Sequence, residues 1–228
     1  MSCNHSDLNP SCIHRVPIFE HLTSDESETV TAAIQSNHYK KGEYIFREGE
    51  KSDKLFIINE GTVKISKLSD HGKEQIIRFL FPGDFFGQFA LLQEKNHYAN
   101  AEVLDASIIC FIHKQDFQLI MEHNPKMAYR FLLAVSERLG QADEWLGTIS
   151  LMETNRRLAK LLILLYDKNN AKSNVRLPAQ KKELAALIGT TPETLSRKLA
   201  LLEEQKLISV TRNNIIIHQP QLLRELAG

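Results

Sequence analysis

The stretch "GTTPETLSRKLALLEEQKL", Gly189 to Leu207, combines a glycine turn with the start of a strongly patterned helix. Gly189 can adopt the left-handed conformation that ends one helix, Thr191 can cap the next, and Pro192 suits the first helical turn, where its missing N–H costs nothing. Three leucines at spacings of four and three form one apolar face: Leu195, Leu199 and Leu202. We expect this face to bury against three residues of the preceding helix: Leu184, Leu187 and Ile188. The pattern predicts a helix-turn-helix.

The opposite face of the same helix carries Glu193, Ser196 and Arg197 near its N-terminal end. In a helix-turn-helix these positions reach base edges in the major groove, where arginine binds guanine, glutamate accepts from cytosine N4 and serine adapts to either. The candidate phosphate contacts are Lys181, Lys182, Thr190, Thr191, Thr194 and Lys198. The alternative is a surface helix with an ordinary polar outer face.

The segments around this motif extend the prediction to a winged helix-turn-helix. A helix is expected around Glu153 to Asp167, followed by the polar stretch "DKNNAKSN", which reads as a surface loop. Two apolar strands flank Arg212-Asn213-Asn214 in "LISVTRNNIIIHQP" and predict a hairpin after the recognition helix.

Between residues 40 and 112, glycines separate short apolar runs at near-constant intervals. The four glycines at 49, 61, 72 and 83 stand 12, 11 and 11 residues apart. This spacing is typical of a β-sandwich, barrel or jelly roll. Before it, Ser24 to Ile34 predicts a short helix with Ser24 as its N-cap.

From Pro125 the periodicity becomes that of a long helix. Seven apolar residues step by four and three along it: Ala128, Leu132, Val135, Leu139, Ala142, Leu146 and Ile149. A seam of this length predicts a helix that pairs with its twin in a homodimer. The alternative is that the stripe packs on the β-domain of its own chain.

The length of the chain and its uneven charge agree with a division into two domains. A chain of 228 residues can form two domains, and no apolar run is long enough for a membrane span or a secretory signal, so we expect a cytoplasmic protein without membrane contact. Residues 1–149 carry 15 Lys and Arg against 21 Asp and Glu (−6), whereas residues 150–228 carry 13 against 7 (+6). The basic end is suited to phosphates. We predict a sensor domain at 1–124, a dimerisation helix at 125–152 and a DNA-binding domain at 153–228.

In this order of elements the chain resembles the CRP/FNR superfamily of bacterial transcription regulators. The resemblance implies an α+β fold: a cyclic-nucleotide-binding-type jelly roll, a long dimerisation helix and a winged helix-turn-helix. The Glu-x-x-Ser-Arg pattern at Glu193, Ser196 and Arg197 is similar to that of the FNR branch, which implies an inverted repeat of the TTGAT-N4-ATCAA type. RNA polymerase would be a further partner if the protein is an activator.

The same resemblance argues against cyclic AMP as the ligand. Family members that bind it carry a glutamate after the glycine of "FGE" and an Arg-Ser or Arg-Thr pair about eleven residues on. Here "FFGQFALLQEKNHYANAEV" has Gln88 and Tyr98-Ala99 at these positions. Nothing in this segment neutralises a cyclic phosphate, so we expect no binding of cyclic AMP at physiological affinity.

The cysteines Cys3, Cys12 and Cys110 leave three interpretations open. Cys12 in "SCIHRVPIF" and Cys110 resemble a reversible disulfide pair of FNR-like proteins from lactic acid bacteria. A [4Fe–4S] cluster on all three cysteines would need a fourth ligand such as Asp7, His5 or His14. The third interpretation is that Cys110 is a buried strand residue with no redox role. The scattered histidines show no metal-ligand spacing.

An enzyme is the first competing class, and we find no nucleophile elbow, Walker loop, HExxH or acid pair that would support one, so no catalytic residue is predicted. The second is a cyclic-nucleotide or other small-molecule binding module whose C-terminal helices serve a protein partner. The separate basic excess at residues 150–228 favours DNA over that partner. A regulator with the same fold that responds to a small molecule, or to no effector, is the remaining alternative.

Overall fold

The computed structural model describes residues 16–19, 22–72, 74–212 and 214–228. Its backbone contacts divide the chain into two units, residues 1–139 and 140–228. The boundary falls within the long helix α5 (Pro125–Leu151).

Glycine turns separate the strands of the first unit. The glycines at 49, 61, 72 and 83 have φ values of +87°, +92°, +73° and +91°, in the left-handed region that glycine adopts at little cost. Gly61 also lies against the neighbouring strand, because a Cβ there would stand 1.9 Å from Ser107 Oγ. The strands are β1 (Ile34–Tyr39), β2 (Tyr44–Phe46), β3 (Lys54–Glu60), β4 (Val63–Leu68), β5 (Glu74–Leu80), β6 (Phe85–Phe86), β7 (Asn100–Val103) and β8 (Ser107–His113).

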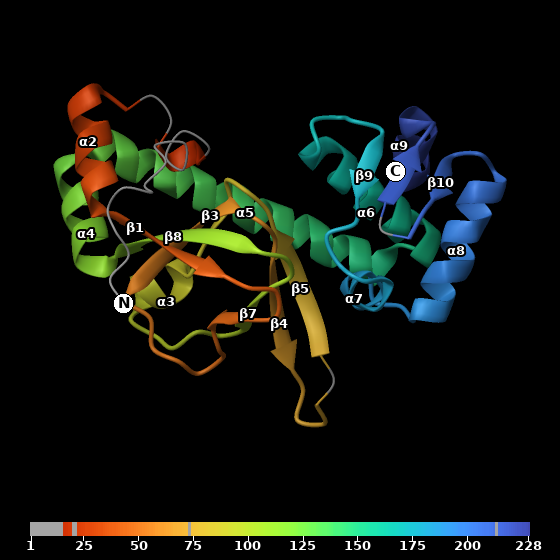
Figure 1. Cartoon of the computed structure of the whole chain (residues 1–228), viewed down its shortest axis with the longest axis horizontal. Helices are drawn as coiled ribbons and strands as arrows, with labels where there is room; N and C mark the ends of the chain where they lie inside the picture. Colours follow the sequence, from red (N-terminus) through yellow and green to blue (C-terminus); the bar gives the residue numbers. More distant parts are fainter. Residues whose placement is uncertain (1–15, 20–21, 73, 213) are drawn as a thin grey trace. The chain divides into compact units, whose positions relative to one another are not determined.

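These strands form two four-stranded antiparallel sheets, in the orders β1-β8-β3-β6 and β2-β7-β4-β5 (Figure 1). Apolar side chains from both sheets, such as Phe56 of β3 and Ile65 of β4, belong to one buried cluster. The predicted β jelly roll is therefore confirmed.

Helices cover the outer face of the first sheet. They are the 3-10 turn η2 (Pro17–Phe19), α2 (Ser24–Ala33), α3 (Gln88–Gln93) and α4 (Lys114–His123), and α2 lies beside α4 (Figure 1). A second buried cluster joins Val16 and Phe19 to Cys110 of β8 and to Phe131 of α5. The cap of α2 is Thr23 rather than the predicted Ser24, because Thr23 and Glu26 form a reciprocal capping box.

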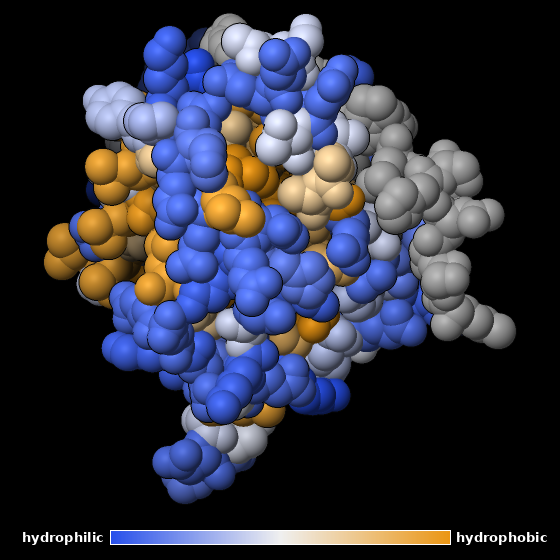
Figure 2. All heavy atoms as spheres, turned by 90° about the vertical axis from the view of Figure 1, so that its left-hand side faces the viewer, coloured by the Kyte–Doolittle hydropathy of each residue, from blue (hydrophilic) through white to orange (hydrophobic). Residues whose placement is uncertain are grey.

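The predicted seam along α5 divides into two sets of residues. Leu132, Leu139 and Leu146, seven residues apart, are 62%, 63% and 65% exposed. Val135 instead packs against the core of its own unit, as the alternative interpretation expected. Ala142 is exposed, whereas Ala128 and Ile149 are half-buried. Figure 2 shows one face of the molecule, largely polar, with hydrophobic side chains gathered along one edge.

The described part of the second unit contains four further helices and a small sheet. They are α6 (Thr154–Lys168), α7 (Lys181–Leu187), α8 (Pro192–Glu204) and α9 (Pro220–Ala227), after the end of α5, with β9 (Asn174–Arg176), β10 (Ile208–Val210) and β11 (Asn214–Ile217). The sheet has the order β10-β11-β9, so the predicted hairpin gains a third strand. The loop expected at 167–174 was wrong at both ends, because Asp167 and Lys168 still belong to α6 and Asn174 of β9 pairs with Ile216. Within the described ranges, no helix combines the length and apolarity needed to cross a membrane.

Candidate nucleic-acid interface

The turn between α7 and α8 is built by backbone hydrogen bonds around Gly189. The N–H of Thr190 donates to the carbonyl of Ala185 at 2.9 Å, and the N–H of Gly189 donates to that of Ala186 at 3.3 Å. These two bonds form a Schellman motif, which needs a left-handed residue after the helix, and Gly189 supplies it with φ +65°. The glycine turn predicted from the sequence is present.

The start of α8 is fixed by its cap. Thr191 Oγ1 accepts a hydrogen bond from the N–H of Thr194 at 3.2 Å, and Pro192 occupies the first turn. Six apolar side chains of α7, α8 and the turn are at most 4% exposed: Leu184, Leu187, Ile188, Leu195, Leu199 and Leu202. Because α7 and α8 pack on each other through this face (Figure 1), the other face of α8 is held in a fixed orientation.

The three predicted base-reading residues are exposed on that other face. Glu193 accepts hydrogen bonds from its own backbone N–H and from Thr191, which lowers the pKa of its carboxyl below the usual value, so the group is ionised at neutral pH. Arg197 Nη2 donates to Thr194 Oγ1 at 3.3 Å. The face therefore presents an acceptor, a hydroxyl and a positioned guanidinium within one helical turn.

The six predicted phosphate contacts are spread over α7, the turn and α8. Lys182 and Thr191 are exposed, while Lys181, Thr190, Thr194 and Lys198 are half-buried. The hydroxyls of Thr191 and Thr194 hydrogen-bond to each other at 3.3 Å. The two threonines thus have a structural role in the cap that the sequence pattern predicted only for Thr191.

The small sheet forms the wing beside these helices. Arg212 is exposed in the turn between β10 and β11, and the side chains of Asn214 and Asn174 are joined by a hydrogen bond of 3.0 Å. The strand β9 was not predicted, because its three residues are too few to show a strand pattern.

The predicted redox residues are only partly described. Cys110 is completely buried on β8, between Ser36 of β1 and Ile57 of β3 in register. Cys3 and Cys12 lie outside the described residues, as do Asp7, His5 and His14. Among the residues that the structure describes, no group of three His, Cys, Asp or Glu side chains could hold a metal ion.

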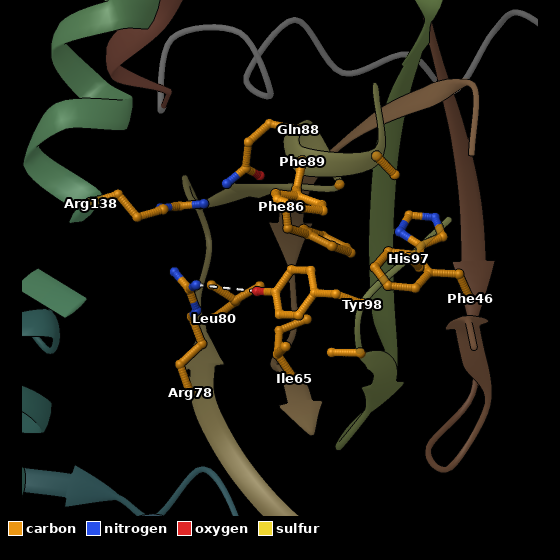
Figure 3. A pocket seen from close by; sticks show the side chains of 13 residues that line it. Phe46, Ile65, Arg78, Leu80, Phe86, Gln88, Phe89, His97, Tyr98 and Arg138 are labelled. Atoms are coloured by element: carbon orange, nitrogen blue, oxygen red, sulfur yellow. Dashed lines mark hydrogen bonds between the residues drawn. The ribbon is translucent and has the colours of Figure 1, made fainter. Parts of the chain in front are cut away.

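A cavity opens in the jelly roll beside α3 and the segment that follows it. Gln88, Tyr98 and Ala99 line it, and so do two arginines, Arg78 and Arg138 (Figure 3). The expectation that cyclic AMP does not bind stays a prediction; it was drawn from Gln88 and Tyr98-Ala99 and did not include these two arginines. These arginines come from β5 and α5, and no local motif marks them.

Two known domain families each match one of the two units of the chain. A model of the cyclic nucleotide-binding domain matches residues 36–124, and a model of the Crp-like helix-turn-helix domain matches residues 156–226. The fold is similar to that of FixK2 from Bradyrhizobium japonicum, with a TM-score of 0.80 and 22% identity over 86% of this chain and 98% of that one.

Two curated relatives match nearly the whole chain. The cyclic AMP receptor protein of Thermus thermophilus is 27% identical over 92% of this chain and 96% of its own length. The probable transcriptional regulator flp of Lacticaseibacillus casei is 28% identical over 95% and 98%. Relatives of both kinds match at similar identity, so the branch is not resolved. The helix-turn-helix is a DNA-binding domain, and the chain is a regulator rather than an enzyme. It belongs to the CRP/FNR superfamily of transcription regulators.

Proposed function

We propose that this regulator acts as a homodimer and that α8 of each subunit reads one half of an inverted repeat similar to TTGAT-N4-ATCAA. The observation that carries the proposal is the exposed face of Glu193, Ser196 and Arg197 at the N-terminal end of α8. The ionised Glu193 accepts from a cytosine amino group, Arg197 donates to a guanine, and Ser196 adapts to either.

Electrostatic attraction to the backbone accompanies this reading. The lysines and threonines of α7, the turn and α8 lie around the reading face, and residues 150–228 carry the basic excess of the chain. The lysine contacts release counterions from DNA, so affinity falls steeply as salt rises, whereas the threonine hydroxyls add uncharged hydrogen bonds. A regulator that acts on DNA in this way works in the cytoplasm.

Exposed leucines support the homodimer. Leu132, Leu139 and Leu146 repeat every seven residues on α5, and each is more than 60% exposed in a single chain. A second copy of α5 against these side chains would bury them in a coiled-coil seam. Two subunits related by a twofold axis then present two recognition helices, which matches an inverted repeat. RNA polymerase is a further partner if the protein is an activator.

For the input signal we propose a thiol–disulfide switch between Cys12 and Cys110. Val16, Ile18 and Phe19 pack in the same buried cluster as Cys110, and Cys12 precedes Val16 by four residues. Four residues span at most roughly 14 Å of extended chain. Oxidation by a disulfide or peroxide removes two electrons and two protons from the thiols, and the bond then ties the start of the chain to β8.

A gel-shift with a TTGAT-N4-ATCAA duplex tests the reading face. We expect wild-type protein to retard this duplex more strongly than a scrambled one, and Arg197→Ala to lower specific affinity by about ten- to a hundredfold. Arg47→Ala, which removes an equal charge from an exposed position in the jelly roll, is the matched control and should bind as wild type. Equal retardation of both duplexes by wild-type protein would contradict the proposal.

The switch is tested separately by comparing reduced and oxidised protein. Cys12→Ser and Cys110→Ser should each remove the difference in DNA affinity between the two states, while Cys3→Ser should keep it. A thiol count that falls by two on oxidation would support the pair. Unchanged binding curves in both states for wild type and for both serine variants would exclude this input.

A further inference from the structure

The turn between α7 and α8 lies against the junction of α5 and α6. A Cβ placed on Gly189 would stand 3.1 Å from Arg157 Nη1 of α6 and 3.9 Å from Ile149 Cγ2 of α5. Since glycine has no Cβ, these two side chains approach the backbone of the turn closely. All three residues belong to the second unit. Ile149, which the heptad pattern assigned to the dimer seam, is half-buried beside the turn.

The guanidinium of Arg157 is held more by packing than by hydrogen bonds. Its Nη2 donates to Thr154 Oγ1 at 3.2 Å, one turn earlier in α6. Its Nε is buried, and no hydrogen-bond partner reaches it among the described residues. A buried polar nitrogen without a partner lowers stability, so an apolar side chain would stabilise this position better than arginine does. The presence of arginine points to a role other than stability.

The end of α5 is fixed to α6 beside this contact. Lys160 Nζ of α6 donates a hydrogen bond to Glu144 Oε1 of α5 at 2.6 Å, and the side chain of Lys160 is only 24% exposed. Thr148, one helical turn after Glu144, is 1% exposed. The last two turns of α5 are therefore packed within the same unit as the helix-turn-helix.

We propose that Arg157 is a positioning residue for DNA reading. Its guanidinium fills the space beside Gly189 and fixes the turn, so that the base-reading face of α8 keeps one orientation relative to the end of α5. The inference deepens the proposed function, because it names the residue that orients α8. The turn ends where α8 begins, at Pro192, so a shift of the turn displaces the whole reading face.

This role predicts a selective effect on binding. Contacts to base edges need the correct position and angle of each side chain, whereas contacts to phosphates carry no sequence information and depend chiefly on charge. A turn without its support should therefore lose affinity for a specific duplex and keep most of its affinity for a scrambled one.

Fluorescence anisotropy of the full-length protein measures the ratio of these two affinities. The specific duplex is the one that wild-type protein selects from a random pool, so the test does not depend on the TTGAT-N4-ATCAA assignment. We expect Arg157→Ala to lower the ratio at least about tenfold, an effect as large as that of one base contact. Arg157→Lys keeps the charge but not the forked guanidinium, so it should restore the affinity for the scrambled duplex without restoring the ratio.

Arg156, the exposed neighbour on the same helix, provides the matched control. Arg156→Ala removes an equal charge, so it should change both affinities by the same factor and leave the ratio as in wild type. Circular dichroism confirms that each variant is folded. The proposal is overturned if Arg157→Ala keeps the wild-type ratio. It is also overturned if Arg157→Lys has the wild-type ratio, because the charge alone would then be sufficient.

A double-mutant cycle with Gly189→Ala tests the contact without DNA. In wild-type protein the added methyl group strains the backbone at φ +65° and presses on Arg157. In Arg157→Ala protein only the backbone strain remains, so Gly189→Ala should lower the urea midpoint less in that background. Additive changes would show that the two residues do not interact and would overturn the proposal. A wild-type protein that selects a different DNA sequence would contradict the proposed site alone, since neither the ratio nor the cycle depends on that sequence.

Discussion

Arg197 Nη2 donates a hydrogen bond to Thr194 Oγ1, one turn earlier in α8, at 3.3 Å. The same hydroxyl meets Thr191 Oγ1 at 3.3 Å, so the cap of the helix and the arginine that we expect to read guanine are joined by one short chain of hydrogen bonds. This arrangement orients a long side chain before DNA arrives, which reduces the rotamer entropy lost on binding.

Thr194→Val should therefore weaken sequence-specific binding by about three- to tenfold, because the net free energy of one hydrogen bond corresponds to a change of that size. Affinity for a scrambled duplex should fall much less, because valine removes at most one uncharged phosphate contact and leaves the charges in place. Thr194→Ser keeps the hydroxyl and serves as the control. Fluorescence anisotropy with both duplexes measures the two affinities. Equal losses on both would mean that Thr194 contacts phosphate instead of positioning Arg197.

Leu139→Glu should dissociate the proposed dimer. Leu139 is 63% exposed in one chain and lies at the middle of the leucine repeat, so a second α5 would bury a carboxylate there. We expect the dimer dissociation constant to rise at least about tenfold, which corresponds to about 1.4 kcal/mol. Sedimentation velocity measures it. Leu119→Glu is the matched control on α4, where the leucine is 54% exposed, and should remain dimeric. A dimeric Leu139→Glu protein would place the subunit contact elsewhere.

Gly189→Ala should destabilise the DNA-binding unit. At φ +65° an alanine is strained, and its Cβ would lie 3.1 Å from Arg157 Nη1. We expect a loss of about 1 to 2 kcal/mol in the free energy of unfolding, measured by urea denaturation. Gly189→Asn should lose less, because asparagine tolerates this conformation better. If the alanine variant is as stable as wild type, the turn does not require a left-handed residue.

His97 should make stability depend on pH. Burial lowers its pKa from 6.5 to about 4, with a smaller opposing effect of Glu50. Because the unfolded chain takes up this proton at higher pH than the folded one, His97 favours the folded state above about pH 6.5 and this contribution is lost as the pH falls toward 4. The loss is up to about 3 kcal/mol. His97→Phe, which can keep the stack on Phe46, should flatten the pH dependence of unfolding between pH 6.5 and 4. An unchanged slope would show that another group causes it.

Much of the recognition unit could be predicted from the sequence because short-range interactions build it. Gly189, the Thr191 cap and the leucine spacing act within two helical turns, and each has the predicted role in the structure. The glycine turns of the jelly roll are equally local. The cap of α2 was misplaced by one residue, because Thr23 and Ser24 are both good caps and the side chain of Glu26 decides between them.

Tertiary packing alone decided which side of α5 is exposed. The heptad pattern predicts the same environment for Val135 and Leu139. In the structure the core formed with β8 and α4 covers Val135 and leaves Leu139 in solvent. The placing of the two cavity arginines could not be predicted from the sequence either. Arg78 and Arg138 are 60 positions apart and line one cavity only when β5 and α5 pack in one unit. The sequence by itself determined the helix that we propose reads DNA, because neighbours along the chain set its turn, cap and apolar face. Only the folded structure assembled the cavity, because charges distant in sequence interact through space and not through any local pattern.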